Sequence, residues 1–174
     1  QTQASFQQRL QAIDAIRSRE SDVAWELMKN LLPAPHSTSS PTSTPRWREW
    51  TLDRNPTVTD MERRQASKEV VARMLGDVSD NGSRWQDLIE NLGNLADDER
   101  PAIFQKLAST SRDTLRQEDQ MAIWDILRYT ISHHREFPTA YWSMSKSDLD
   151  ELESIYRQFT PKDLLTQNLW PFSR

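Results

Sequence analysis

The sequence predicts an all-α fold, and three observations support that prediction. Apolar residues recur along most of the chain at the 3.6-residue spacing of amphipathic helices. Residues that cap helices repeatedly stand just before these apolar stripes. No segment shows the long alternation of β-branched and polar residues that is typical of a strand. We therefore expect seven or eight helices packed as antiparallel hairpins, in an α-solenoid-like array or an irregular bundle.

The first two predicted helices form a hairpin. One covers residues 5–17, and the next begins at about Asp22 after a short turn near Glu20. Pro33 and Pro35 end the second helix, because proline cannot continue the backbone hydrogen-bond ladder. The residues expected to face inward are Phe6, Leu10, Ile13 and Ile16, then Trp25, Met28, Leu31 and Leu32.

Two capping boxes place the third and fourth helices. In such a box a hydroxyl and a Glu or Gln three residues later satisfy each other's free backbone N–H groups. Thr59 and Glu62 form the first box, and Gly76 is expected to end that helix. Ser83 and Gln86 form the second box. The stripes behind the two boxes are Val70, Val71, Met74 and Leu75, then Trp85, Leu88, Ile89, Leu92 and Leu95.

The fifth helix is expected to start at Asp97-Asp98, with Pro101 in its first turn, where a missing N–H costs little. Thr114 and Gln117 form a third capping box. The helix behind that box is the longest, reaches about His134, and is apolar on more than one side. Such a helix is usually packed between neighbours. Its apolar residues are Leu115, Met121, Ala122, Trp124, Ile126, Leu127 and Ile131, and those of the fifth helix are Ile103, Phe104 and Leu107.

Two further helices complete the prediction. Ser147, followed by carboxylates, marks the start of one helix, and Thr160-Pro161 opens a short last one. The first of these turns Leu149, Leu152, Ile155, Tyr156 and Phe159 inward, and the second carries Leu164 and Leu165. We expect residues 1–174 to form a single helical domain. Because the chain begins at Gln1, we expect it to be a fragment of a larger protein.

An irregular insertion interrupts this pattern at residues 33–58. Three helices begin their stripes with a tryptophan, at Trp25, Trp85 and Trp124, which are 60 and 39 residues apart. Removing the 18 residues 33–50 brings the first interval to 42. Both intervals then approach the repeat of HEAT and armadillo proteins, roughly 40–47 residues. A degenerate helical repeat and an irregular bundle both remain consistent with the sequence.

Composition narrows the classes of function. Lys and Arg number 22 against 26 Asp and Glu, which gives a net charge of −4 and disfavours nucleic acid as a partner. The chain has no cysteine, which removes thiolate metal sites and suits a cytoplasmic protein. Its three glycines leave no glycine-rich phosphate loop. No apolar run approaches the ~20 residues of a membrane span. We expect no cofactor, no metal and no enzymatic activity.

The candidate interaction patch is the end of the insertion, at Arg46, Trp47, Arg48 and Trp50. Arg and Trp are enriched in binding hot spots. The favoured interpretation is that the two tryptophans pin the segment to the helices while the arginines extend into solvent. Two alternatives stay open: a binder of single-stranded nucleic acid through Arg46, Arg48 and Arg54, and an enzyme domain with its site on residues 33–50.

Other chemistry-bearing groups have structural explanations. His133 and His134 point about 100° apart on a helix, so a shared metal is disfavoured and a place at the helix C-terminus is favoured. The carboxylates at 97–99 and 148–151 stand at predicted helix starts. The Ser/Thr run at 37–44 has no assigned base partner. Tyr141-Trp142-Ser143-Met144 is expected to pack into the core.

Part of the first third of the chain resembles a segment of very large bacterial proteins. The residues that carry the resemblance are Trp25, Leu31-Leu32-Pro33, His36, Ser40-Pro41-Thr42 and Pro45 to Trp50. Those proteins join an effector or nucleotide-hydrolysing module to a long helical array, and some are similar to the signal-transduction ATPases of bacterial defence systems. The resemblance covers about 30 residues. It implies a HEAT- or armadillo-like slice of the array, with the nucleotide site elsewhere and no catalytic residue carried over.

These observations together predict a non-enzymatic scaffold or sensor segment of a larger bacterial protein. Its expected partner is another protein or the rest of its own parent chain, because stacked helices offer extended surfaces for such contacts.

Overall fold

The computed structural model describes residues 4–34 and 59–161. Within those two stretches the chain forms seven α-helices, two single-turn 3-10 helices and no strand, which confirms the all-α prediction. Nearly all of the insertion 33–58 and the predicted short last helix lie outside the described residues. None of the described helices is long and apolar enough to cross a membrane.

The chain divides into two compact units, Gln1–Ala72 and Arg73–Arg174. The first unit contains α1 (Phe6–Arg17), α2 (Ser21–Leu31) and the larger part of α3 (Asp60–Asp77). The second unit contains the end of α3 and the elements α4 (Gly82–Glu90), η1 (Leu92–Asn94), α5 (Arg100–Ser109), η2 (Arg112–Thr114), α6 (Gln117–Glu136) and α7 (Lys146–Phe159).

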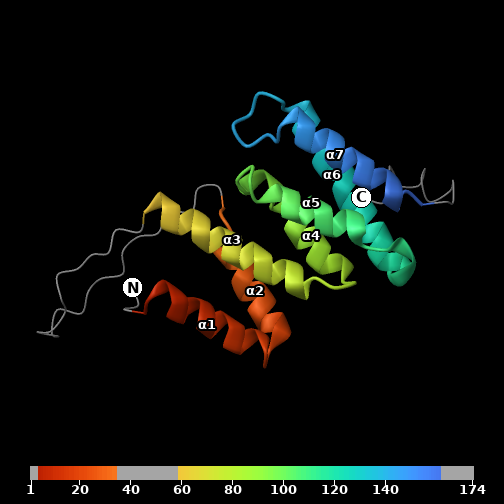
Figure 1. The fold of residues 1–174 in the computed structure, drawn as a ribbon. Helices are drawn as coiled ribbons and strands as arrows, with labels where there is room; N and C mark the ends of the chain where they lie inside the picture. Colours follow the sequence, from red (N-terminus) through yellow and green to blue (C-terminus); the bar gives the residue numbers. More distant parts are fainter. Residues whose placement is uncertain (1–3, 35–58, 162–174) are drawn as a thin grey trace, which may run out of the picture. The chain divides into compact units, whose positions relative to one another are not determined.

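In the first unit, α1 and α2 pack as the predicted hairpin (Figure 1). The predicted stripes supply the buried residues Leu10 and Ile13 of α1, and Trp25 and Met28 of α2. One inward assignment is wrong, because Leu31 is 49% exposed. The chain leaves α2 at this point, and Leu32, the other residue predicted to face inward here, is buried.

In the second unit, α6 packs against both α4 and α7, and α7 also packs against α5 (Figure 1). This arrangement confirms that the longest helix lies between neighbours, as its apolar residues on several sides predicted. The tryptophans Trp85 and Trp124, which open two of the stripes, are both buried. The core of this unit therefore forms where α4, α6 and α7 meet.

The first predicted capping box is confirmed and the other two are wrong. Glu62 N–H donates to Thr59 Oγ1, and Thr59 N–H donates to Glu62 Oε2, at 3.2 and 2.8 Å. The Thr59 N–H and, second, the Thr59 hydroxyl both donate to Glu62 Oε2, and these two bonds lower the pKa of the Glu62 carboxyl. Ser83 is inside α4, whose N-cap is Asn81. Thr114 belongs to η2, and α6 begins at Gln117 without a side-chain cap.

Three further boundaries differ from the prediction by a few residues. Ser145, not Ser147, caps α7 by accepting from Asp148 N–H at 3.1 Å. The N-cap position of α5 is held by Glu99 rather than Asp97-Asp98, while Pro101 does lie in the first turn. Gly76 does not end α3, which continues through Asp77. The left-handed backbone falls instead at Ser79, with φ of 46°.

A carboxylate from α6 completes the start of α4. Asp119 Oδ1 accepts the Gly82 N–H at 2.8 Å, and Arg116 Nε donates to Asp119 Oδ2 at 2.8 Å. Burial of Asp119 acts to raise the pKa of its carboxyl, but the hydrogen bonds from Arg116 and Gly82 outweigh it and the pKa is lowered. A Cβ on Gly82 would lie 2.7 Å from the Asp119 Cα, so this approach requires glycine.

The true cap of α4 can be tested with two neighbouring variants. Asn81→Ala removes the oxygen that accepts the Arg84 N–H, and we expect a loss of about 1 kcal/mol in the free energy of unfolding. Ser83→Ala is the matched control, because Ser83 is exposed within the helix and should change stability very little. Urea denaturation of both variants measures the difference. A larger loss from Ser83→Ala would restore the sequence-based assignment.

Candidate protein-interaction surface

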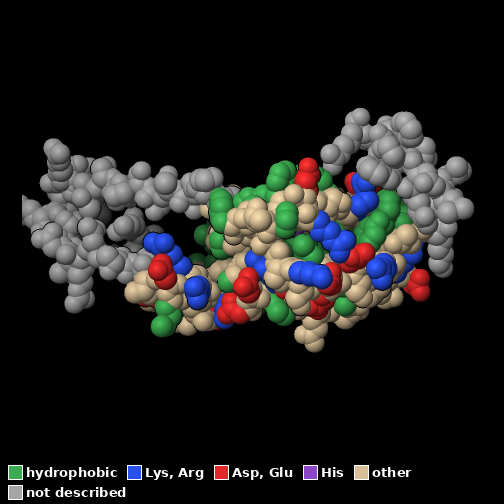
Figure 2. Space-filling view, turned by 90° about the horizontal axis from the view of Figure 1, so that it is seen from above, with side chains coloured by type: hydrophobic (Ala, Val, Ile, Leu, Met, Phe, Trp, Pro, Cys, Tyr) green, Lys and Arg blue, Asp and Glu red, His purple; other side chains and the backbone are tan. Residues whose placement is uncertain are grey.

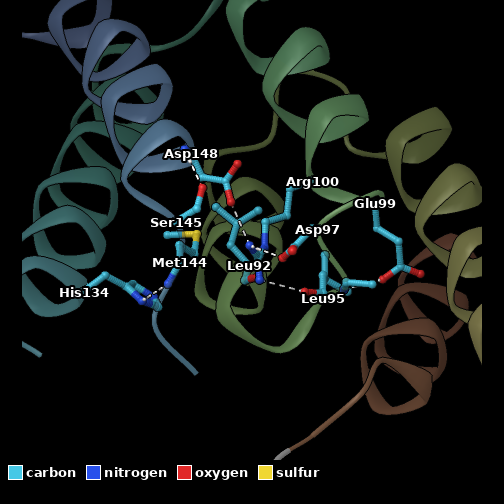
Figure 3. Close-up of polar contacts among 10 residues, drawn as sticks. Leu92, Leu95, Asp97, Glu99, Arg100, His134, Met144, Ser145 and Asp148 are labelled. Carbon is cyan, nitrogen blue, oxygen red and sulfur yellow. Dashed lines mark hydrogen bonds and ion pairs between the residues drawn. The ribbon is translucent and has the colours of Figure 1, made fainter. Parts of the chain in front are cut away.

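A buried arginine connects three elements of the second unit. Arg100, the first residue of α5, is 5% exposed and donates in four directions (Figure 3). Its Nε donates to the Leu92 carbonyl and its Nη2 to the Leu95 carbonyl, each at 2.9 Å. Its Nη1 donates to Asp97 at 2.9 Å and to Asp148 at 2.7 Å. The guanidinium thus binds the η1 turn, its own helix start and the first turn of α7.

The neighbouring carboxylates have the structural places that the sequence predicted. Asp97 and Asp148, from two helix starts, meet on Arg100 (Figure 3). Glu99 is buried, and its Oε2 accepts the Ala96 N–H at 2.9 Å. Asp150 Oδ1 lies 3.6 Å from Arg135 Nη2.

A histidine holds the loop between α6 and α7. The Met144 N–H donates to His134 Nδ1 at 3.1 Å (Figure 3), and the Ser143 hydroxyl donates to the His134 carbonyl at 3.0 Å. Because Nδ1 accepts, the proton of the neutral ring is on Nε2. A Cβ on Gly93 would lie 2.9 Å from the His134 Cε1, so η1 approaches this ring closely.

His134 is held neutral. Burial is the largest cause, followed by the nearby charges of His133 and Arg100, and together they lower its pKa to about 4. A neutral His134 does not supply the positive charge that favours histidine at a helix C-terminus. Its position in the last turn of α6 is as predicted, but its role is to accept a hydrogen bond from the loop.

An aromatic surface covers the end of α6. We use this name for Tyr129, His133, Phe137, Tyr141 and Trp142. The His133 ring stacks between those of Tyr129 and Trp142, with centroids 5.7 and 4.7 Å away and planes within 10°. Phe137 meets both His133 and Trp142 edge-on or tilted, at 5.4 and 6.0 Å. Four of the five rings therefore form one continuous cluster.

Much of this surface is open to solvent. Tyr129 is 46% exposed, Phe137 44% and Tyr141 83%. The prediction that residues 141–144 pack into the core holds for Met144, which is buried, and is wrong for Tyr141. The backbone around Tyr141 is held by the Ser143 N–H, which donates to the Ala140 carbonyl at 2.9 Å, while the Tyr141 side chain is exposed.

Charged side chains show no segregation by sign on the face drawn in Figure 2, where Lys and Arg alternate with Asp and Glu. Among residues 4–34 and 59–161, no three His, Asp or Glu side chains are grouped so that they could hold a metal ion. The face drawn in Figure 2 therefore shows no strongly charged patch.

The patch predicted from the sequence falls on residues that the structure does not describe. Arg46, Trp47, Arg48, Trp50 and Arg54 all lie outside the described residues, as do His36 and the Ser/Thr run 37–44. Sequence reasoning missed the buried hydrogen-bonding role of Arg100 and the stacking of His133 between two aromatic rings. The spacing of Asp97 and Arg100 in one helical turn was a signal for the first. For the second, the signal was aromatic residues at i, i+4 and i+8 from Tyr129.

No protein-family model, curated protein or solved structure matches this chain.

Removal of the buried guanidinium should be far more damaging than removal of an exposed one. Arg100→Ala leaves Asp148 and two carbonyls without their donor, and we expect a loss of roughly 3–5 kcal/mol in unfolding free energy. Arg157→Ala is the control. It breaks an exposed ion pair with Glu153, which is worth less than about 1 kcal/mol. Denaturant titrations measure both, and equal losses would show that Arg100 does not organise the unit.

Stability should fall as acid protonates His134. The folded pKa of about 4 lies below the ordinary 6.5, so the unfolded chain binds more protons between these values. The stabilisation is complete above pH 6.5 and is lost as the pH falls toward 4, by up to about 3 kcal/mol.

The matched variant is His134→Asn, which keeps an acceptor near the Nδ1 position but does not titrate. We expect the difference in unfolding free energy between the two proteins to shrink from pH 7 to pH 4.5, because only the parent protein loses the contribution of the neutral histidine. Parallel curves would contradict the buried neutral histidine.

Proposed function

We propose that this chain is a non-enzymatic protein-interaction segment of a larger bacterial protein. We further propose that the aromatic surface at the end of α6 is where the partner binds. The observation that carries the proposal is the exposure of three large aromatic side chains, Tyr129, Phe137 and Tyr141, within one part of one unit. Aromatic residues are enriched at protein interfaces, where burying them is strongly favourable.

The way the surface is held supports a binding role. His133 is clamped between Tyr129 and Trp142, and His134 fixes the loop that carries Trp142. A surface that is already ordered loses little side-chain freedom when a partner binds. The absence of cysteine and the resemblance to bacterial helical arrays support a cytoplasmic protein of this kind. The same resemblance makes the rest of the parent chain a second source for the partner.

The surface can be tested by site-specific photo-crosslinking in the full-length parent protein, expressed in its own cells. Benzoylphenylalanine placed at Tyr141 should give an adduct with one discrete protein, or one discrete segment of the parent chain. The same probe at Gln105, which is exposed on α5, is the control and should not give that adduct. Identical adducts at both positions, or none at Tyr141, would reject the proposal.

A substitution separates binding from folding. Tyr141→Ala removes an 83% exposed side chain, so the unfolding free energy should change by less than about 0.5 kcal/mol. The yield of the adduct, now measured with the crosslinker at Phe137, should fall. A large loss of stability would instead show that Tyr141 is a packing residue.

A further inference from the structure

We infer that the partner presents arginine side chains, in a basic segment that lies along the aromatic surface. This inference rests on the proposed function and names the chemistry of the partner. It follows from the charge of the elements that carry the surface and from the kind of ring faces they expose.

The helices that carry and flank the surface are net acidic. Together α6 and α7 contain eight Asp and Glu residues against four Lys and Arg, and residues 137–145 between them carry no charge. Six of the eight carboxylates bind arginine, including Arg100 and Arg116 from outside the two helices, so only Glu136 and Glu151 have no ion pair among the described residues. Arg135 is already bound to Glu153. Glu136 is exposed and makes no ion pair with any described residue. It directly precedes Phe137 and follows His133 by three positions, so it lies beside the rings. A cationic partner complements this arrangement, and an acidic one does not.

The rings themselves favour a planar cation. A guanidinium stacks on the face of an aromatic ring, which is electron-rich, and it is less strongly hydrated than an ammonium group. The protein shows this geometry internally, where the Arg128 guanidinium carbon lies 5.5 Å over the Trp124 ring. Tyr141, which is 83% exposed, offers a ring of the same kind to an incoming arginine. Arginine is therefore expected to be preferred over lysine at equal charge.

The test uses labelled synthetic peptides of equal length, built from Gly and Ser with arginine, lysine or glutamate at regular intervals. Fluorescence anisotropy against the full parent protein measures their affinities. We expect the arginine peptide to bind most tightly, the lysine peptide several-fold more weakly, and the glutamate peptide not at all. Tyr141→Ala should lower the affinity for the arginine peptide by about two- to fivefold, the effect of one exposed cation–π contact. Glu136→Gln should lower the affinity for both cationic peptides.

Three results would overturn the inference: no binding of the arginine peptide, equal binding of arginine and lysine peptides, or binding that Tyr141→Ala does not change. The last two would identify simple charge attraction away from the rings. If photo-crosslinking from Tyr141 succeeds while the arginine peptide fails, the interaction surface stands and only the chemistry of the partner is wrong. If crosslinking also fails, the proposed function falls with it.

Discussion

The second unit depends on a buried charge that must be fully satisfied. Moving a guanidinium out of water is costly, and the cost is recovered only when its donors find good acceptors. Arg100 meets this condition with two carbonyls and two carboxylates, which come from η1, α5 and α7. The positions of these elements are therefore coupled, since each supplies an acceptor that the same planar group requires. Apolar burial alone would allow them to slide relative to one another.

The aromatic surface depends on this arrangement indirectly. Arg100 fixes the start of α7 through Asp148, and the chain just before α7 carries Met144, whose N–H binds His134. The loop is thus held at its α7 end by a charge and along its length by a neutral imidazole. Its rings are presented by a framework of buried polar contacts. The positive charge of Arg100 is also one cause of the low pKa of His134, so the two polar groups influence each other directly.

The helices could be predicted because burial of apolar side chains follows the local period of the sequence. Stripes such as Trp85, Leu88 and Ile89 become core in any helical packing. The first residue of each helix was harder to predict, since several residues near each start can act as the cap and tertiary contacts decide which of them does. Asp119, which lies 37 residues away, helps to set the start of α4. The burial of Arg100 and of His134 could not be predicted, because it depends on partners such as Asp148 and Met144 that sequence spacing does not bring together. The predicted patch at residues 46–50 lies outside the described residues. The aromatic surface could be recognised only from the exposed fractions of its side chains in the structure.

The long-range polar contacts of the second unit also bear on its synthesis. The Arg100–Asp148 and Arg112–Thr160 contacts each span 48 residues, and in each the later partner belongs to the region of α7. When α4 and α5 leave the ribosome, the Leu92 and Leu95 carbonyls and Asp97 are present, but Asp148 and the Thr160 carbonyl have not yet been made. This unit therefore completes its folding only after α7 emerges. A nascent chain stalled before α7 lacks one carboxylate partner of Arg100 and the helix that packs on α5 and α6, and such incompletely packed chains are prone to aggregate.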